Sequence, residues 1–216
     1  MSKIDDLIQE YCPDGVEFRS FGDIATIVRG ASPRPIQSYL TSSLDGVPWV
    51  KIGDAEIGAK YITNTTQRIT REGAKKSRYV KKGDFILSNS MSFGRPYIMG
   101  VDGCIHDGWL SISNFEEYLN SDFLYYLLLT DEFQMEMEKR ASNGGAVKNL
   151  NADIIKSIKI PLPPMILQKE IVNILDKFTE LQAELQAELQ ARVKQYEWYR
   201  NDLLSFKDKN ATKTAI

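Results

Sequence analysis

The stretch from residue 165 to residue 207 constrains the fold most, because it contains neither glycine nor proline. Alanine, leucine, glutamine, glutamate and lysine dominate it, and all five favour the α-helix. A helix of these 43 residues is on the order of 60 Å long at ~1.5 Å per residue. A globule of ~150 residues has a radius of gyration near ~15 Å. The helix is therefore expected to project beyond a domain formed by the rest of the chain.

This helix carries a stripe of apolar side chains that needs a partner helix to leave water. The apolar stripe consists of Ile171, Ile174, Phe178, Leu181, Leu185, Leu189, Val193, Tyr196, Tyr199 and Leu203. A second copy of the same chain is the most economical partner. The stripe therefore predicts a homodimer formed through the helix.

A four-residue unit, Leu-Gln-Ala-Glu, repeats inside the stripe, so that its apolar positions are spaced by four from Leu181 to Val193. Such spacing locally unwinds a coiled coil. Two interpretations stay open. The repeat is either replication slippage that a helix tolerates, or a way to adjust length. Adding or removing one unit changes the helix by ~6 Å while rotating its face by only ~40°.

The residues before the helix predict an α+β domain, mostly β with a few helices. A short helix is expected at 2–11, and a longer one at 121–140 that opens with Ser121 or Asp122 as its cap. Strand-like runs bounded by turn residues are 23–28, 47–52, 60–63, 84–88, 96–101, 108–113 and 155–160. Because strands and helices do not alternate regularly, a doubly wound sheet is not expected.

Three prolines between residues 160 and 164 mark the boundary before the long helix, since proline removes backbone donors and disfavours helix. We therefore divide the chain into a domain at 1–160, a junction and long helix at 161–207, and a tail at 208–216.

Positive charge is concentrated in residues 68–82, although the chain as a whole has a formal net charge of −2. This basic segment contains seven basic side chains and one acid, Glu72, so it carries +6 and the remainder carries −8. Its basic residues are Arg68, Arg71, Lys75, Lys76, Arg78, Lys81 and Lys82. Such a cluster is typical of phosphate contacts to nucleic acid, and it is equally compatible with a solvated helix or turn.

Three polar loops supply groups that read base edges and phosphates, namely hydroxyls, amides and guanidinium groups. They occupy residues 28–35, 87–96 and 141–151. Their candidate DNA-binding residues are Arg29, Arg34, Ser88, Asn89, Ser90, Ser92, Arg95, Asn143, Lys148 and Asn149. We add Lys51, and His106 as a hydrogen-bond donor to a ligand. Each loop alone is an ordinary loop, but together with the basic segment they favour nucleic-acid binding.

No catalytic set is recognisable in the sequence. Cys12, Cys104 and the single histidine are too few for a Cys/His zinc site, and the two cysteines are expected to be buried small side chains. Residues 13–19, PDGVEFR, place two carboxylates on one turn rather than on neighbouring strands of a metal-nuclease site. A P-loop lysine and a glycine-rich cofactor loop after a strand are also missing. With neither a secretory signal nor a membrane-length apolar run, we expect a cytoplasmic, non-catalytic protein.

Four segments together resemble the specificity (S) subunits of type I restriction-modification enzymes over nearly the whole chain. They are LIQEYCPDGVEFRSFGDIATIVRG at 7–30, VPWVKIGDA at 47–55, GDFILSNSMSFGRPYI at 83–98, and NLNADIIKSIKIPLPPMILQKEIVNILDKF at 149–178. In that family a target recognition domain reads half of a split DNA sequence, and a long helix connects it to a second such domain. Four-residue repeats in the spacer helix occur in the family as length variants that change the gap between half-sites.

The resemblance implies a DNA-binding subunit without a cofactor of its own. Modification (methyltransferase) and restriction subunits would join it and bring S-adenosylmethionine, ATP and Mg²⁺. The family pattern has two recognition domains and two helical regions, whereas this chain has one of each. We therefore expect two copies to pair as an antiparallel coiled coil and to read a palindromic bipartite target.

Other classes of function stay open at this point. A coiled-coil scaffold with an unrelated ligand domain predicts a dimer that is not retained on DNA. An enzyme predicts turnover by the isolated chain. A regulatory half-subunit would compete for the modification subunit.

Overall fold

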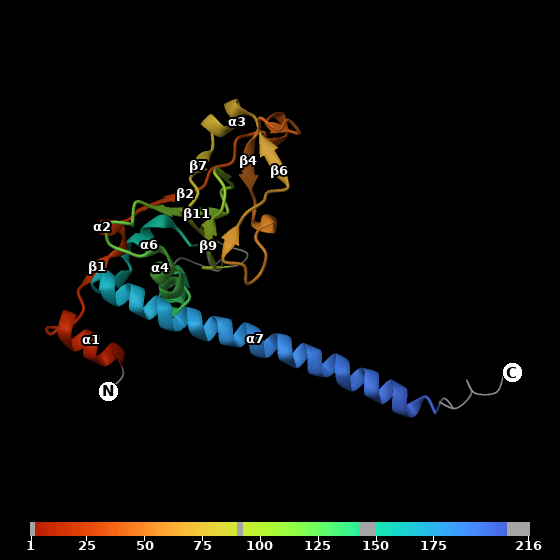
Figure 1. Cartoon of the computed structure of the whole chain (residues 1–216). Coiled ribbons are helices and arrows are strands. Elements are labelled where there is room, and N and C mark those ends of the chain that lie inside the picture. Colours follow the sequence, from red (N-terminus) through yellow and green to blue (C-terminus); the bar gives the residue numbers. More distant parts are fainter. Residues whose placement is uncertain (1–2, 90–92, 143–149, 207–216) are drawn as a thin grey trace. The chain divides into compact units, whose positions relative to one another are not determined.

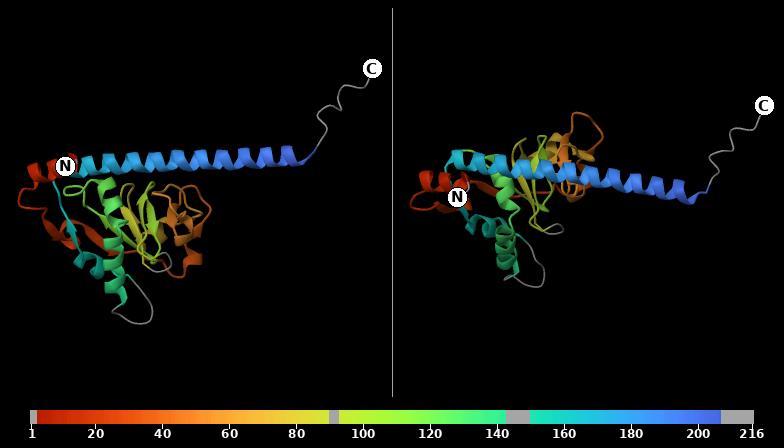
Figure 2. Two further views of the ribbon diagram at one scale, coloured as in Figure 1. Left: turned by 90° about the horizontal axis from the view of Figure 1, so that it is seen from below. Right: turned by 60° about the horizontal axis from the view of Figure 1, so that its bottom comes forward.

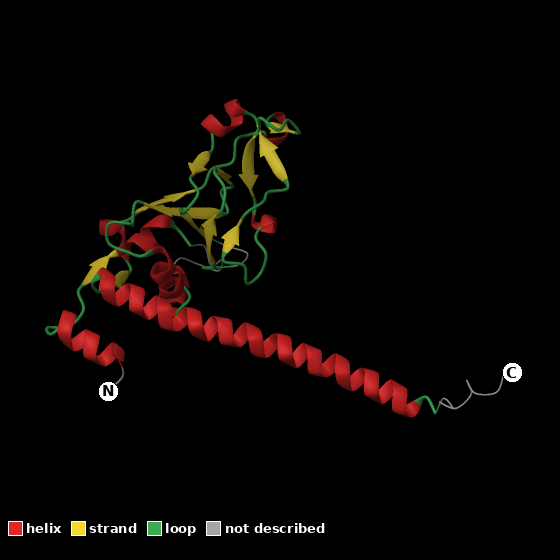
Figure 3. Cartoon of the chain, in the orientation of Figure 1, coloured by secondary structure: helices red, strands yellow, loops and turns green. Residues whose placement is uncertain are grey.

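The computed structural model describes residues 3–89, 93–142 and 150–206. The chain separates into two units, Met1–Ile171 and Val172–Ile216. The first unit is a mixture of short strands and short helices, and the second continues a long helix (Figures 1 and 3). The α+β class and the long C-terminal helix are thus as the sequence predicts.

Two five-stranded sheets form the body of the first unit. The β4 sheet contains, in spatial order, β3 (Leu40–Thr41), β6 (Gln67–Ile69), β4 (Val47–Val50), β10 (Gly103–Ile105) and β7 (Arg78–Val80). The β11 sheet contains, in the same manner, β2 (Thr26–Arg29), β11 (Trp109–Ser113), β8 (Phe85–Ser88), β9 (Pro96–Met99) and β5 (Tyr61–Ile62). The pairs β10–β4 and β5–β9 are parallel, and the other pairs are antiparallel. A separate antiparallel pair joins β1 (Phe18–Ser20) to β12 (Lys159–Pro161).

The main core lies between these two sheets, and the two-residue period of a strand decides which side chains enter it. Val50 of β4 and Ile105 of β10 pack against Trp109 and other side chains of the β11 sheet. Their neighbours Trp49 and Cys104 are on the opposite face, where they form a second buried cluster with Ile69. That face is covered by the short helix α3 (Arg71–Lys75) and the 3₁₀ turn η1 (Ile36–Ser38). Both cysteines are free and buried, as predicted.

The remaining short helices are α1 (Lys3–Tyr11), α2 (Phe21–Ile24), α4 (Ser121–Leu128), α5 (Asp131–Ser142) and α6 (Ala152–Ser157). The helix predicted at 121–140 is two helices, because the chain leaves helical geometry after Leu129 and Thr130 accepts a bond from the Phe133 amide to start α5. The cap of α4 is Asn120 rather than Ser121 or Asp122, and its side chain accepts from two backbone amides.

Two predicted strands are also wrong in part. The run 23–28 begins inside α2, and only its later residues join β2. The run 155–160 begins inside α6, which the Asn151 side chain caps by accepting from the Ile154 amide at 2.9 Å. In both cases a short helix of one or two turns carries apolar residues that also fit a strand period.

Helix α7 (Met165–Leu204) is one continuous helix of 40 residues, seen from three sides in Figures 1 and 2. Its first turns belong to the first unit. There the Gln168 side chain, 1 % exposed, donates to the carbonyls of Tyr118 and Pro163 and accepts from the Asn120 amide, each at 2.8 Å. The start of α7 is therefore fixed by a buried and fully bonded amide.

Candidate nucleic-acid interface

The turn between β10 and β11, residues 106–108, is the point where two of the predicted polar loops meet. Asp107 is its centre. The carboxylate of Asp107 accepts from the Ser32 hydroxyl at 2.6 Å and pairs with Arg34 at 3.7 Å. Its backbone carbonyl accepts from the Arg29 guanidinium at 3.0 Å and from the Asn89 amide at 2.8 Å. The loops at 28–35 and 87–96 are thus joined through one acidic residue.

His106 also contacts Asp107. We call Asp107 and the residues that contact it, Arg29, Ser32, Arg34, Asn89 and His106, the hub. The Nδ1 of His106 accepts from the Gly108 amide at 2.8 Å, which leaves Nε2 to carry the proton, and Nε2 lies 3.1 Å from the Asp107 carboxylate. The Ser32 hydroxyl lowers the pKa of Asp107 most, and the neighbouring His106 lowers it further, against the opposing effect of partial burial. Asp107 therefore stays ionised and holds these donors in place.

Gly30 lets the 28–35 loop approach the turn closely. Its amide donates to the Trp109 carbonyl at 2.8 Å, and the next amide, of Ala31, donates to the Ile105 carbonyl. A Cβ atom at Gly30 would lie 2.1 Å from the His106 carbonyl oxygen, so no side chain fits there. The contact between the loop and the turn depends on this glycine.

A hollow of about 320 Å³ opens between this hub and the outer face of the β4 sheet. Its floor is apolar and includes Ile36, Leu40 and Trp49, while polar groups surround it. The polar lining residues are Ser32, Arg34, Gln37, Lys51, Gln67 and His106. Three predicted DNA-binding residues, Arg34, Lys51 and His106, are therefore brought to one place.

A second hollow, also about 320 Å³, adjoins the first, because both are lined by Leu40 and Gln67. It extends over β3 and β6 to Thr41, Ser42 and Arg68. Among the described residues that line the two hollows there is no carboxylate. Basic side chains line them instead, namely those of Arg34, Lys51, Arg68 and His106. A surface with this chemistry favours an anionic ligand.

The basic segment 68–82 is divided among β6, α3 and β7, so its charges are not on a single face of one element. Arg68 is half-buried and donates to the Gly46 carbonyl at 2.8 Å, so it also supports the β3–β4 turn. Lys76 lies over the Tyr39 ring and donates to its hydroxyl. Arg78 donates to the Arg29 carbonyl at 3.3 Å. Within the described residues of this segment, the exposed basic side chains without such tethers are those of Arg71 and Lys75 on α3 and of Lys81 and Lys82 after β7.

The described residues of the loop at 87–96 contribute fewer exposed polar side chains than the sequence indicates. Ser88 and Asn89 are buried, and Ser88 Oγ accepts from the Arg95 amide at 3.1 Å. These two side chains therefore support the hub rather than face solvent. Arg95 is half-buried. Five predicted contact residues lie outside the described residues: Ser90, Ser92, Asn143, Lys148 and Asn149.

The apolar stripe of α7 is exposed along most of the second unit. From Phe178 to Leu203 its eight side chains are between 48 % and 67 % exposed in the single chain. Ile171 and Ile174 are half-buried. A row of large apolar side chains this exposed is unusual for a surface without a partner.

Sequence reasoning missed Ser32, Gln37, Gln67 and Asp107 as site residues. One signal was present for the first two, since Ser32 directly precedes the Pro-Arg-Pro of residues 33–35 and Gln37 follows it by two positions. The position of Gln67 depends on the pairing of β6 between β3 and β4, which no local pattern reveals.

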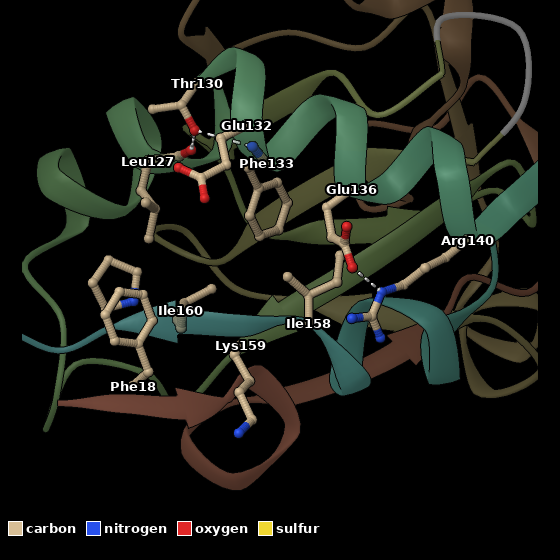
Figure 4. A pocket seen from close by; sticks show the side chains of 11 residues that line it. Phe18, Leu127, Thr130, Glu132, Phe133, Glu136, Arg140, Ile158, Lys159 and Ile160 are labelled. Atoms are coloured by element: carbon tan, nitrogen blue, oxygen red, sulfur yellow. Dashed lines mark hydrogen bonds and ion pairs between the residues drawn. The ribbon is translucent and has the colours of Figure 1, made fainter.

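A larger hollow has different chemistry and lies elsewhere on the first unit. It has a volume of about 420 Å³, and β1, β12, α4 and α5 enclose it. Figure 4 shows Phe18, Leu127 and Phe133 around its interior, with Glu132 and Glu136 on one side. Glu136 is paired with Arg140 at 2.6 Å, whereas Glu132 adds negative charge. Two basic lining residues, Arg140 and Lys159, match its two acids, so this hollow has no excess of positive charge that would favour phosphates.

Neither a metal site nor a membrane span is found in the part of the chain that the structure describes. No group of three or more His, Cys, Asp or Glu side chains is arranged there to hold a metal ion. None of the described helices has the length and apolar character needed to cross a bilayer.

Comparisons with known proteins identify the family of this chain. A family model described as "Type I restriction modification DNA specificity domain" matches residues 13–195. A putative type I restriction enzyme specificity subunit of Haemophilus influenzae is 32 % identical over 174 residues, which are 77 % of this chain and 43 % of that protein. The EcoprrI specificity subunit of Escherichia coli is 27 % identical over 207 residues, covering 89 % of this chain and 51 % of the relative.

A solved chain from a type I R-M system has the same fold, with a TM-score of 0.67 at 23 % identity; 90 % of this chain and 48 % of that chain are covered. The present chain thus spans about half the length of the relatives it matches.

Proposed function

Because the chain belongs to the family of type I restriction-modification DNA specificity domains, we propose that it is the subunit that reads DNA sequence for a type I system and catalyses no step itself. The observation that carries the proposal is the extent of the family match, residues 13–195, which includes the sheets, the hub at Asp107 and most of α7. A recognition role also agrees with hollows that are lined by amides, hydroxyls and cations but by no carboxylate among the described residues.

The DNA is expected to lie over the outer face of the β4 sheet. Exposed cations of α3 neutralise phosphates, while the groups around the two hollows contact the groove. Arg34 is suited to either task, because its side chain is 85 % exposed and its guanidinium lies beside the Asp107 carboxylate, at 3.7 Å. Phosphate contacts give affinity and base contacts give sequence preference.

Two copies of the chain are expected to act together. The exposed stripe of α7 buries its apolar surface by pairing with the same stripe of a second copy. In an antiparallel pair the two recognition units lie at opposite ends, and two-fold symmetry presents the same reading surface twice. The target is then a palindrome of two half-sites with a spacer between them.

Partner subunits supply the chemistry in this proposal. A modification subunit with S-adenosylmethionine methylates the bases, and a restriction subunit with ATP and Mg²⁺ cleaves DNA. The specificity chain determines the position along the DNA at which the modification and restriction subunits act. All of these events take place in the cytoplasm.

The test is co-expression of the chain with a type I modification subunit, followed by size measurement and by sequencing of methylated DNA. We expect a complex with two specificity chains and methylation at a palindromic bipartite sequence. Replacing Leu185 and Leu189 by glutamate should abolish both results, because charge on the stripe prevents pairing. The matched control replaces Gln186 and Gln190 by glutamate, one residue along and off the stripe. A complex with one specificity chain and a non-palindromic target would refute the dimer.

A further inference from the structure

Gln67 has an unusual position in the recognition unit. It lies on β6, with β3 on one side and β4 on the other, and pairs in register with Trp49. It is also one of the two residues shared by the two hollows. Because it is two residues before the buried Ile69 on the same strand, it is on the face that bears Trp49. Its backbone is paired with β4, whereas the pairing of β6 with β3 begins at the next residue, Arg68.

The side-chain amide of Gln67 has no hydrogen-bond partner within the described part of the chain, although the residue is half-buried. The ammonium group of Lys51, half-buried across the same hollow, likewise has no partner there. Polar groups at the lining of a hollow that have no protein partner are free to bond water or a ligand. A neutral amide between cations is suited to a ligand with both an anionic and a hydrogen-bonding part.

We propose that Gln67 is a specificity-determining residue whose amide binds the edge of an adenine in the major groove of each half-site. An amide offers a donor and an acceptor side by side, and adenine presents the complementary pair, N7 and the N6 amino group. Lys51 and Arg34 hold the flanking phosphates or neighbouring bases. This inference rests on the proposed DNA-reading function and names the residue and base through which one position of the site is read.

The experiment uses the full chain with a type I modification subunit, randomised duplex DNA and sequencing of methylated products. Two variants are compared with the wild type, Gln67→Ala and Gln67→Glu. For Gln67→Ala we expect preference for adenine at one position of each half-site to fall by about 5- to 150-fold, with the other positions unchanged. For Gln67→Glu we expect the preferred base at that position to become cytosine, because a carboxylate accepts from the cytosine N4 amino group.

Lys75→Ala provides the matched control, since Lys75 is exposed on α3 and lines neither hollow. It should weaken methylation of all sequences alike and leave the preferred site unchanged. Gln67 variants that keep the wild-type preference at every position, or that weaken all positions equally as Lys75→Ala does, overturn the inference. If instead the wild type selects no sequence, the proposed function itself fails. Misfolding cannot change which base is preferred. Gln67→Glu therefore distinguishes an effect on base recognition from an effect on the stability of the protein.

Discussion

Deleting residues 185–188 removes one Leu-Gln-Ala-Glu unit from α7 and should shorten the spacer between the two half-sites. Four residues of α-helix rise ~6 Å, and B-DNA rises ~3.4 Å per base pair, so the expected change is about one or two base pairs. The same deletion rotates the helix face by ~40°, and one base pair rotates the duplex by roughly 34°, at ~10.5 base pairs per turn. Length and rotation therefore change together in the protein and in the DNA.

The assay is sequencing of methylated sites produced by the variant together with its modification subunit. Half-sites should stay the same, because the deletion lies outside the first unit, Met1–Ile171. A length-preserving control, Gln186→Lys within the same unit, should leave the spacer unchanged, and a duplicated unit should lengthen it. An unaltered spacer in the deletion variant would refute the argument that α7 sets the distance.

Three further predictions concern the first unit and are measured by urea unfolding. Gly30→Ala should destabilise the protein by about 1–3 kcal/mol and weaken DNA binding, because the new Cβ atom would lie 2.1 Å from a backbone carbonyl oxygen. The control Gly53→Ala should not change stability, because no atom lies within 4 Å of a Cβ at that position. Gln168→Ala should lower the free energy of unfolding by about 2–4 kcal/mol, because it leaves three backbone groups unpaired. The control Lys169→Ala changes an exposed neighbour and should not destabilise the protein. Equal effects of the two variants would contradict the stabilising role of the Gln168 amide. Asp107→Asn should cost about 1 kcal/mol at pH 7. The pKa of Asp107 is lowered in the folded state, so its contribution to stability is present above the usual carboxyl pKa of ~4 and is lost as the pH falls through the folded value. A stability difference between wild type and Asp107→Asn that stays constant from pH 7 to pH 3 would contradict the role given to this carboxylate.

The long helix was predictable because its signals are local. Forty helical residues without glycine or proline, and an apolar residue every three or four positions, require no knowledge of the rest of the fold. The short elements were harder. The apolar residues of 155–160 satisfy both a strand and a helix pattern, and the Asn151 cap decided the outcome. The break at Leu129 in the predicted helix 121–140 likewise carries no glycine or proline to announce it.

The candidate site was predictable by residue type but not by arrangement. Arg29, Arg34 and His106 were identified because cations and imidazoles on loops are typical of DNA contacts. That Arg29 and Arg34 both reach Asp107 depends on contacts between residues 78 and 73 positions apart, which no local pattern contains. Asn89 was identified for its amide, and the fold uses that amide internally to hold the turn. Chemistry is thus visible in the sequence, while the choice between a structural and a binding role is made by the tertiary contacts.

A distance set by α7 requires that the helix be fixed at its start as well as stiff along its length. Helix stiffness follows from the unbroken backbone ladder between Met165 and Leu204. Fixation follows from Gln168, whose three bonds join the first turns of α7 to the segments around Tyr118 and Pro163. The same residue type is therefore used in two ways in this chain. The buried amide of Gln168 is satisfied inside the protein and holds the start of α7, whereas the amide of Gln67 has no partner within the described residues and, in our proposal, reads the DNA.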